Sequence, residues 1–176
     1  MKKKKSDFEA SFWAGRTGGC PLQLFDAFFS KYPLGEAKQW LSSMMVYAVK
    51  RKVFSEKDPS VVFHFYLSLR SFIRAAHRLS LTSGKYTLNH PPERLSPMVQ
   101  GALSDEEYAD PLLVFRRAFE DYRLKEFDHF ITGIAYFSLG PYGDYPDGNS
   151  IEPFLHLQKM LDAAQVILER GEREVG

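Results

Sequence analysis

Apolar residues recur at steps of three and four along most of the chain, the spacing that places them on one face of an α-helix. The pattern is clearest in the segments 21–32, 37–48, 59–81 and 154–168. No stretch alternates apolar and polar residues for long, and nothing resembles two strands joined by a hairpin turn. The sequence therefore predicts an all-α fold, a compact single-domain bundle of about five or six helices.

The segment 59–81 has the broadest apolar arc of the chain. Asp58 is a favourable N-cap, and Pro59 suits the first helical position. Phe63 and Leu67 lie on the other side of the first half of this helix, so we expect that half to have neighbours on two sides. We predict that it is the central helix of the bundle. The arc consists of Val61, Phe65, Tyr66, Leu69, Phe72, Ile73, Ala76 and Leu79.

The segment after Pro111 carries two apolar stripes that do not share one face of a straight helix. The first stripe ends at Tyr122 and the second begins at Phe127. The two stripes point about 90° apart if the helix is unbroken. A break near residues 124–126 explains this offset, and so does one long helix buried on two faces. The pattern leaves both interpretations open.

Two internal segments lack helical periodicity. Residues 82–103 are predicted to form a long irregular loop, which is either functional or disordered. Residues 140–150, GPYGDYPDGNS, contain the residue types of a turn, and only Tyr142 and Tyr145 have no role in it. At the chain ends we expect the basic residues 1–5 to be disordered and residues 170–176 to fray.

Composition and charge narrow the class of protein. A chain of 176 residues that is 44% hydrophobic and 26% charged fits one globular helical domain over 1–176, and 15% aromatic residues predict an aromatic-rich core. A net charge of +1 disfavours bulk nucleic-acid binding. The single cysteine, Cys20, fits a reducing compartment, so we expect a cytoplasmic protein. No apolar run approaches the roughly 20 residues of a membrane span, and no motif indicates a cofactor.

One pair of residues has metal-ligand spacing. Glu126 and His129 stand three residues apart, as ligands do on a helix of di-iron bundle proteins. Such a site needs a second pair of the same spacing, and the nearest candidate, Glu152 with His156, is four residues apart. A metal-binding bundle enzyme is therefore the weaker of two catalytic alternatives.

The other alternative rests on Arg123 and His129, which have the spacing Arg-x(4 to 6)-His. This spacing resembles that of HEPN-type ribonucleases, small all-α proteins in which the pair is implied to cleave RNA without metal. The resemblance covers two residues and the fold class, and Leu124 stands where such sequences often have a polar residue. An imidazole can exchange the 2′-hydroxyl proton while a guanidinium holds the phosphate. On an unbroken helix the two side chains point about 120° apart, so their convergence requires the break near residue 125.

Arg70, Arg74 and Arg78 stand at successive four-residue steps on a segment without acidic residues from 59 to 81. We expect this arginine row to pair within the bundle, with Glu120, Asp121 or Glu126, or to bind an acidic partner. No constellation meets the spacing that catalysis needs. The leading interpretation is a non-catalytic protein-interaction module that binds another protein through the arginine row, Tyr142 and Tyr145.

Overall fold

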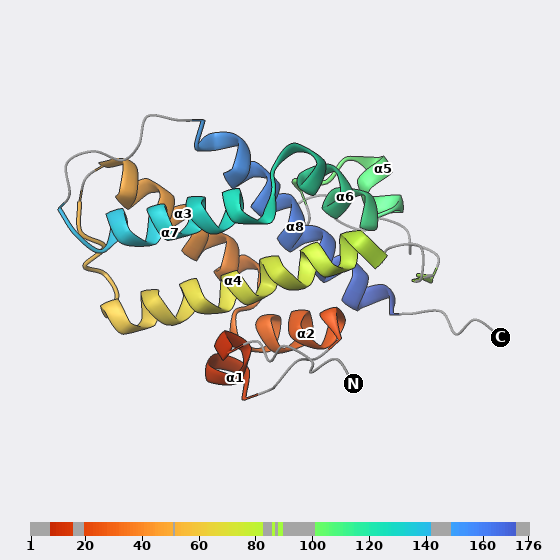
Figure 1. Ribbon diagram of the computed structural model, residues 1–176, viewed down its shortest axis with the longest axis horizontal. Helices are drawn as coiled ribbons and strands as arrows, with labels where there is room; N and C mark the ends of the chain where they lie inside the picture. The colour runs from red at the N-terminus through yellow and green to blue at the C-terminus, as the bar shows by residue number, and fades with distance from the viewer. Residues whose placement is uncertain are drawn as a thin grey trace.

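The computed structural model describes residues 8–15, 20–50, 52–82, 86, 88–89, 101–141 and 149–171. Every regular element in these ranges is an α-helix, which confirms the all-α prediction. Figure 1 shows the helices gathered into a compact bundle. In chain order the helices are α1 (Phe8–Ala14), α2 (Pro21–Lys31), α3 (Leu34–Lys50), α4 (Pro59–Thr82), α5 (Asp105–Ala109), α6 (Leu112–Asp121), α7 (Leu124–Ser138) and α8 (Ile151–Arg170).

The described residues form eight helices, so the expected number of five or six was too low. One of the additional helices is α5, which has five residues, too few for a periodic stripe. The capping box of Ser104 and Glu107 starts it: the Glu107 backbone N–H donates to Ser104 Oγ at 3.2 Å, and the Ser104 N–H donates to Glu107 Oε2 at 2.9 Å. The other arises because the segment after Pro111 is two helices.

A break between α6 and α7 accounts for the two apolar stripes of that segment. α6 ends at Asp121, Tyr122 has extended backbone angles (φ −132°, ψ 133°), and α7 begins at Leu124. The Glu126 carboxylate accepts a hydrogen bond of 2.7 Å from the Arg123 backbone N–H and so stabilises the start of α7. The interpretation as two helices is confirmed, with the break at residues 122–123.

The central helix is α4, as predicted. It contacts α1, α2, α6 and α7, and Figure 1 shows it along the length of the molecule between α2 and α7. Asp58 starts it by accepting the Ser60 backbone N–H at 2.8 Å, and this bond and that of the Ser60 hydroxyl hold the pKa of Asp58 below its usual value. A second packing neighbour was expected on the side of α4 that carries Phe63 and Leu67. Leu67 does pack against the core, but half of Phe63 is exposed.

The core is rich in aromatic residues. The ring centroid of Phe25 on α2 lies 4.8 Å from that of Phe72 on α4 and 5.8 Å from that of Phe115 on α6. Each of these three side chains is fully buried. Because rings of this size bury much area, one cluster holds three helices together.

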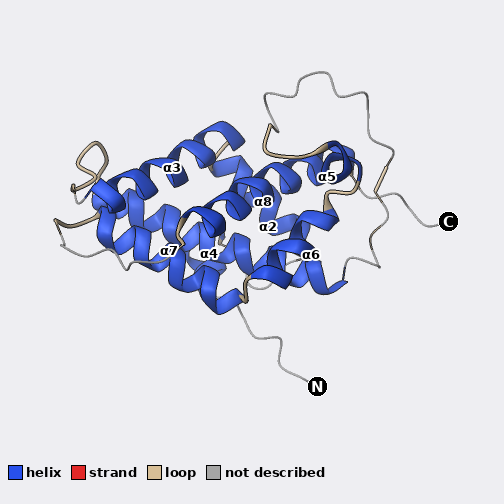
Figure 2. Ribbon diagram, turned by 90° about the horizontal axis from the view of Figure 1, so that it is seen from above, coloured by secondary structure: helices blue, strands red, loops and turns tan. Residues whose placement is uncertain are grey.

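Helix α8 lies between α3 and α6, as Figure 2 shows from above, and it also contacts α2 and α5. Its fully buried Asp162 accepts hydrogen bonds of 2.7 and 3.0 Å from Lys38 Nζ and one of 3.1 Å from the Ala102 backbone N–H. At its end Arg170, within the stretch expected to fray, is buried and donates to the carbonyls of Tyr108 and Ala109. These bonds fasten the C-terminal half of α8, while its N-terminal half keeps an exposed side.

No described helix has both the length and the apolar character needed to cross a lipid bilayer.

Candidate functional site

The arginine row pairs with carboxylates inside the bundle, though not with those expected. Arg70 Nη1 lies 2.8 Å from Glu9 Oε1, and Arg70 Nε lies 3.2 Å from Asp128 Oδ1. Arg74 also pairs with Glu9, while Arg78 is exposed. Glu9 is on α1 and Asp128 on α7, the helices on either side of this face of α4. The row therefore joins α1, α4 and α7, and its role in partner binding stays a prediction.

The residues of the ribonuclease resemblance, Arg123 and His129, are both exposed. The break at residues 122–123 comes immediately before α7, so Arg123 is the N-cap of α7 and His129 lies further along the same helix. Convergence of the two side chains required a break between Arg123 and His129, whereas the observed break lies at residues 122–123.

The weaker metal proposal involves the same helix turn. The Glu126 carboxylate is engaged in capping α7, through its bond to the Arg123 N–H. No group of three or more His, Cys, Asp or Glu side chains arranged to hold a metal ion is found among the described residues. Tyr142 and Tyr145 lie outside the described residues, as does most of the loop expected over 82–103.

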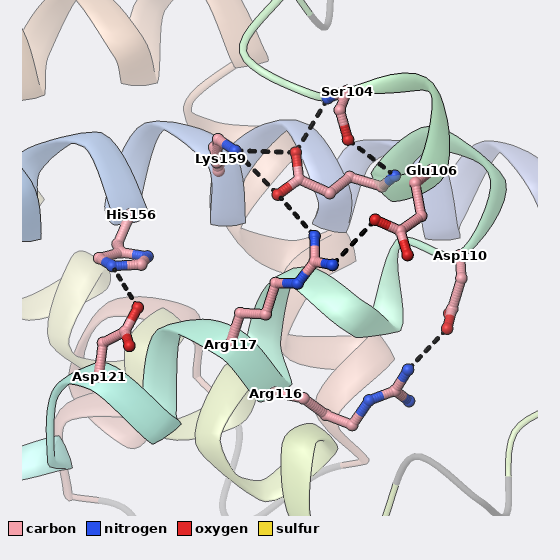
Figure 3. A network of polar contacts seen from close by, with 9 residues as sticks. Ser104, Glu106, Asp110, Arg116, Arg117, Asp121, His156 and Lys159 are labelled. Atoms are coloured by element: carbon pink, nitrogen blue, oxygen red, sulfur yellow. Dashed lines mark hydrogen bonds and ion pairs between the residues drawn. The ribbon is translucent and has the colours of Figure 1, made fainter.

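A different cluster of polar residues lines a hollow of about 530 Å³ between α6 and α8. We call this hollow the α6–α8 groove. Figure 3 shows Arg117 and Asp121 of α6 pointing toward Lys159 and His156 of α8. It is lined by Glu107, Val114, Arg117, Glu120, Asp121, Glu152, Leu155, His156 and Lys159.

One end of the groove has matched charges. The buried Glu107 carboxylate accepts two hydrogen bonds of 2.8 Å from Lys159 Nζ, and Arg117 Nη1 approaches it to 3.7 Å. Arg117 Nη2 also donates to Glu106 at 2.8 Å (Figure 3). Burial by itself raises the pKa of Glu107, but the hydrogen bonds from Lys159 and Ser104 outweigh it and hold the pKa below its usual value. This carboxylate is therefore ionised, and the cationic side chains of Lys159 and Arg117 balance its negative charge.

The other end has an excess of carboxylates. His156 Nε2 lies 3.2 Å from Asp121 Oδ2 (Figure 3), and the largely buried His156 ring packs 5.7 Å from that of Tyr122. The Tyr122 hydroxyl donates to Glu152 at 2.7 Å, and this bond raises the pKa of Tyr122 to about 12. Tyr122 and His156 thus position two carboxylates at the mouth of the groove.

The groove as a whole has a negative lining. Four of the residues that line it are carboxylates and two, Arg117 and Lys159, are permanent cations. Both cations are next to Glu107, and of the other three carboxylates that line the groove Asp121 lies beside the His156 imidazole. Glu120 and Asp121 lie in the last turn of α6, which has no basic residue. A helix C-terminus disfavours negative charge, so their carboxylates add to a potential that is already negative.

Four exposed aliphatic side chains lie beside the groove, between 43% and 64% exposed. We call them the α3–α8 patch: Val46, Val49, Ile151 and Leu155.

The position of the patch follows from the register of two antiparallel helices. Lys38 of α3 binds Asp162 of α8, and one turn later Ser42 Oγ accepts from Gln158 Nε2 at 3.2 Å. Continuing this register places Val46 beside Leu155 and, one turn further, Val49 beside Ile151. Leu155 belongs both to the patch and to the lining of the groove, so the two meet at this residue.

The sequence interpretation missed this surface. Glu120 and Asp121 were considered only as partners of the arginine row, and His156 only as a metal ligand. A signal did exist: Val46, Val49, Ile151 and Leu155 are apolar but fall off the main stripes of their helices. Comparisons of the chain with models of protein families, with curated proteins and with solved structures gave no match.

Proposed function

We propose that the protein is a non-catalytic interaction module that binds a partner protein on the surface formed by the α3–α8 patch and the α6–α8 groove. The name α8 docking surface is used for the two together. The observation that carries the proposal is that Leu155, one of four exposed aliphatic side chains on α3 and α8, also lines a polar hollow. Exposed apolar residues scattered singly are ordinary, whereas a contiguous group with a polar border is typical of protein-binding sites.

The polar groups of the surface support recognition better than reaction chemistry. The nearest to a catalytic arrangement is His156 with Asp121, which resembles the histidine and carboxylate of a triad. A triad of this kind also needs the hydroxyl or thiol of a serine, threonine or cysteine within hydrogen-bond reach of the imidazole. None of the residues that line the groove is a serine, threonine or cysteine. The largely buried His156 imidazole, which lies 3.2 Å from Asp121, is instead suited to positioning the Asp121 carboxylate.

The proposal is tested by capture of partner proteins with affinity-tagged full-length chain, followed by cross-linking and mass spectrometry. The variant Val49→Asp/Leu155→Asp places two charges in the patch and is expected to lose the partners that the unsubstituted chain captures. Leu81→Asp is the matched control, because Leu81 is also an exposed aliphatic residue but lies at the end of α4. Circular dichroism verifies that all three proteins are folded.

Two results would contradict the proposal. One is capture that is the same for the patch variant and for Leu81→Asp, which would place the interface elsewhere. The other is cleavage of RNA that persists in chelator and is lost in His129→Ala, which would establish the ribonuclease alternative.

A further inference from the structure

We infer that the partner segment is a cationic amphipathic α-helix, whose apolar side packs on the α3–α8 patch while its lysine or arginine side chains enter the α6–α8 groove. This inference rests on the proposed function and specifies the chemistry of the partner. Three features support it: the negative charge of the groove, the position of two of its carboxylates at the C-terminus of α6, and the arrangement of the patch residues on two antiparallel helices.

The charge of the groove selects a cation. Glu107 is neutralised by Lys159 and Arg117, and Asp121 faces His156. Glu120 and Glu152 are exposed, and the partners recorded for the Glu152 carboxylate, Tyr122 and Asn149, are uncharged. A cationic side chain that enters the groove therefore meets unneutralised carboxylates. A nucleic acid would bring its phosphates against the same carboxylates, so this surface disfavours it.

The place of the charge provides an independent argument. Glu120 and Asp121 close α6, where the exposed backbone carbonyls give the helix end a partial negative charge. Acidic residues at this position destabilise the free protein. A cationic ligand removes this penalty when it binds, because it neutralises the carboxylates and the helix end together. The arrangement is therefore poor for stability alone and favourable for binding a cation.

The shape of the surface favours a helical partner. The patch residues are on two antiparallel helices, whose register places Val46 level with Leu155 and Val49, one turn away, level with Ile151. Apolar side chains one turn apart match the stripe of an amphipathic helix, which binds by laying that stripe along such a surface. A peptide that binds by strand addition would need the free edge of a sheet, and the described residues contain no strand.

The experiment uses three synthetic helical peptides that share the same leucine-rich apolar side and have lysine, glutamine or glutamate at the polar positions. Binding to the full chain is measured by fluorescence anisotropy at low and high salt. We expect the lysine peptide to bind about tenfold more tightly than the glutamine peptide and the glutamate peptide to bind least. The preference for lysine should decrease at high salt, because mobile ions screen exposed charges.

Two variants separate this inference from the proposed function. Glu120→Gln/Asp121→Asn/Glu152→Gln removes three negative charges and should abolish the preference for lysine while leaving the glutamine peptide bound. Val49→Asp/Leu155→Asp should lower the affinity of the chain for all three peptides.

Equal affinity for lysine and glutamine peptides, or saturable binding by none of the three, would overturn the inference. The proposed function would then still be judged by the capture experiment. Partner capture that does not respond to Val49→Asp/Leu155→Asp would overturn the proposed function itself.

Discussion

The arginine row of α4 and the α6–α8 groove are both charged surfaces, but they differ in how their charge is matched. In the row, Arg70 and Arg74 meet Glu9 of α1, and Arg70 also meets Asp128 of α7. Each pair joins two helices and is partly shielded from water. In the groove, four carboxylates share two permanent cations, and both cations are at one end.

The difference separates charge that holds the fold from charge that is available to a partner. Matched pairs across a helix interface limit the desolvation penalty of charges that packing partly buries. Unmatched charge on an exposed surface contributes little to folding and repels its neighbours, so it is available for a partner of opposite charge. The four predictions below test this distinction.

The largest expected effect comes from removing the carboxylate shared by two members of the row. Glu9→Ala leaves Arg70 and Arg74 without their common partner, and we expect unfolding to become easier by about 1–2 kcal/mol in a urea titration. Glu120→Ala in the groove is the control and should change stability by less than about 0.5 kcal/mol. A row that acts as the binding site would behave otherwise: Arg74→Glu would abolish partner capture without a loss of stability.

A charge reversal in the groove should have opposite effects on binding and on stability. Glu120→Lys places a cation at the C-terminus of α6 and is expected to raise the free energy of unfolding by about 0.3–1 kcal/mol. The same substitution should lower the affinity for the lysine peptide by about tenfold. Loss of stability together with unchanged peptide affinity would show that Glu120 belongs to the fold and not to the site.

Acid should weaken the matched end of the groove. The pKa of Glu107 is lowered in the folded protein, so its carboxylate stabilises the fold above its unfolded pKa near 4.5, and this contribution is lost as pH falls through the folded pKa. The Glu107→Gln variant should therefore lose less stability on acidification than the unsubstituted chain. Denaturant titrations of both proteins from neutral pH to pH about 3 measure the difference. Parallel curves would mean that the bonds from Lys159 do not hold this carboxyl in its ionised form.

The smallest effect is expected at high pH. The hydrogen bond to Glu152 raises the pKa of Tyr122 from 10.0 to about 12, so the protonated hydroxyl favours the folded state. This contribution is fully present below pH 10.0, the unfolded value, and is lost as pH rises toward about 12. Tyr122 is only partly buried, so solvent screening keeps the effect small. Near pH 11 an ultraviolet titration should show as much tyrosinate in the unsubstituted chain as in Tyr122→Phe, because Tyr122 is still protonated. About one extra tyrosinate in the unsubstituted chain at this pH would contradict the assignment.

Several features of the fold could be predicted because they depend on neighbours in the chain. The periodic apolar stripes predicted the long helices, including α4 with Asp58 at its start, and the offset between the stripes after Pro111 indicated the break. The capping box of Ser104 and Glu107 was legible as a motif, although α5 was too short for its own stripe. Each of these signals lies within a few residues of the element that it specifies.

The sequence was a poorer guide to which residues pair across helices. The arginine row was expected to pair inside the bundle, and it does, but with Glu9 and Asp128 in place of Glu120, Asp121 or Glu126. Nothing in the spacing of the charges indicated that α1 and α7 would flank this face of α4. The candidate site was missed for the same reason, because Asp121 and His156 become neighbours only when α6 packs on α8.

The sequence by itself therefore determined the helices, the aromatic content of the core and the starts of α4 and α5, because hydrophobic periodicity and capping act over one or two turns of the chain. The tertiary structure alone decided which carboxylate Arg70 and Arg74 meet, and that Leu155 of α8 borders a negative groove together with Glu120 and Asp121 of α6. Those contacts join residues far apart in the chain, and their identity depends on the packing of whole helices.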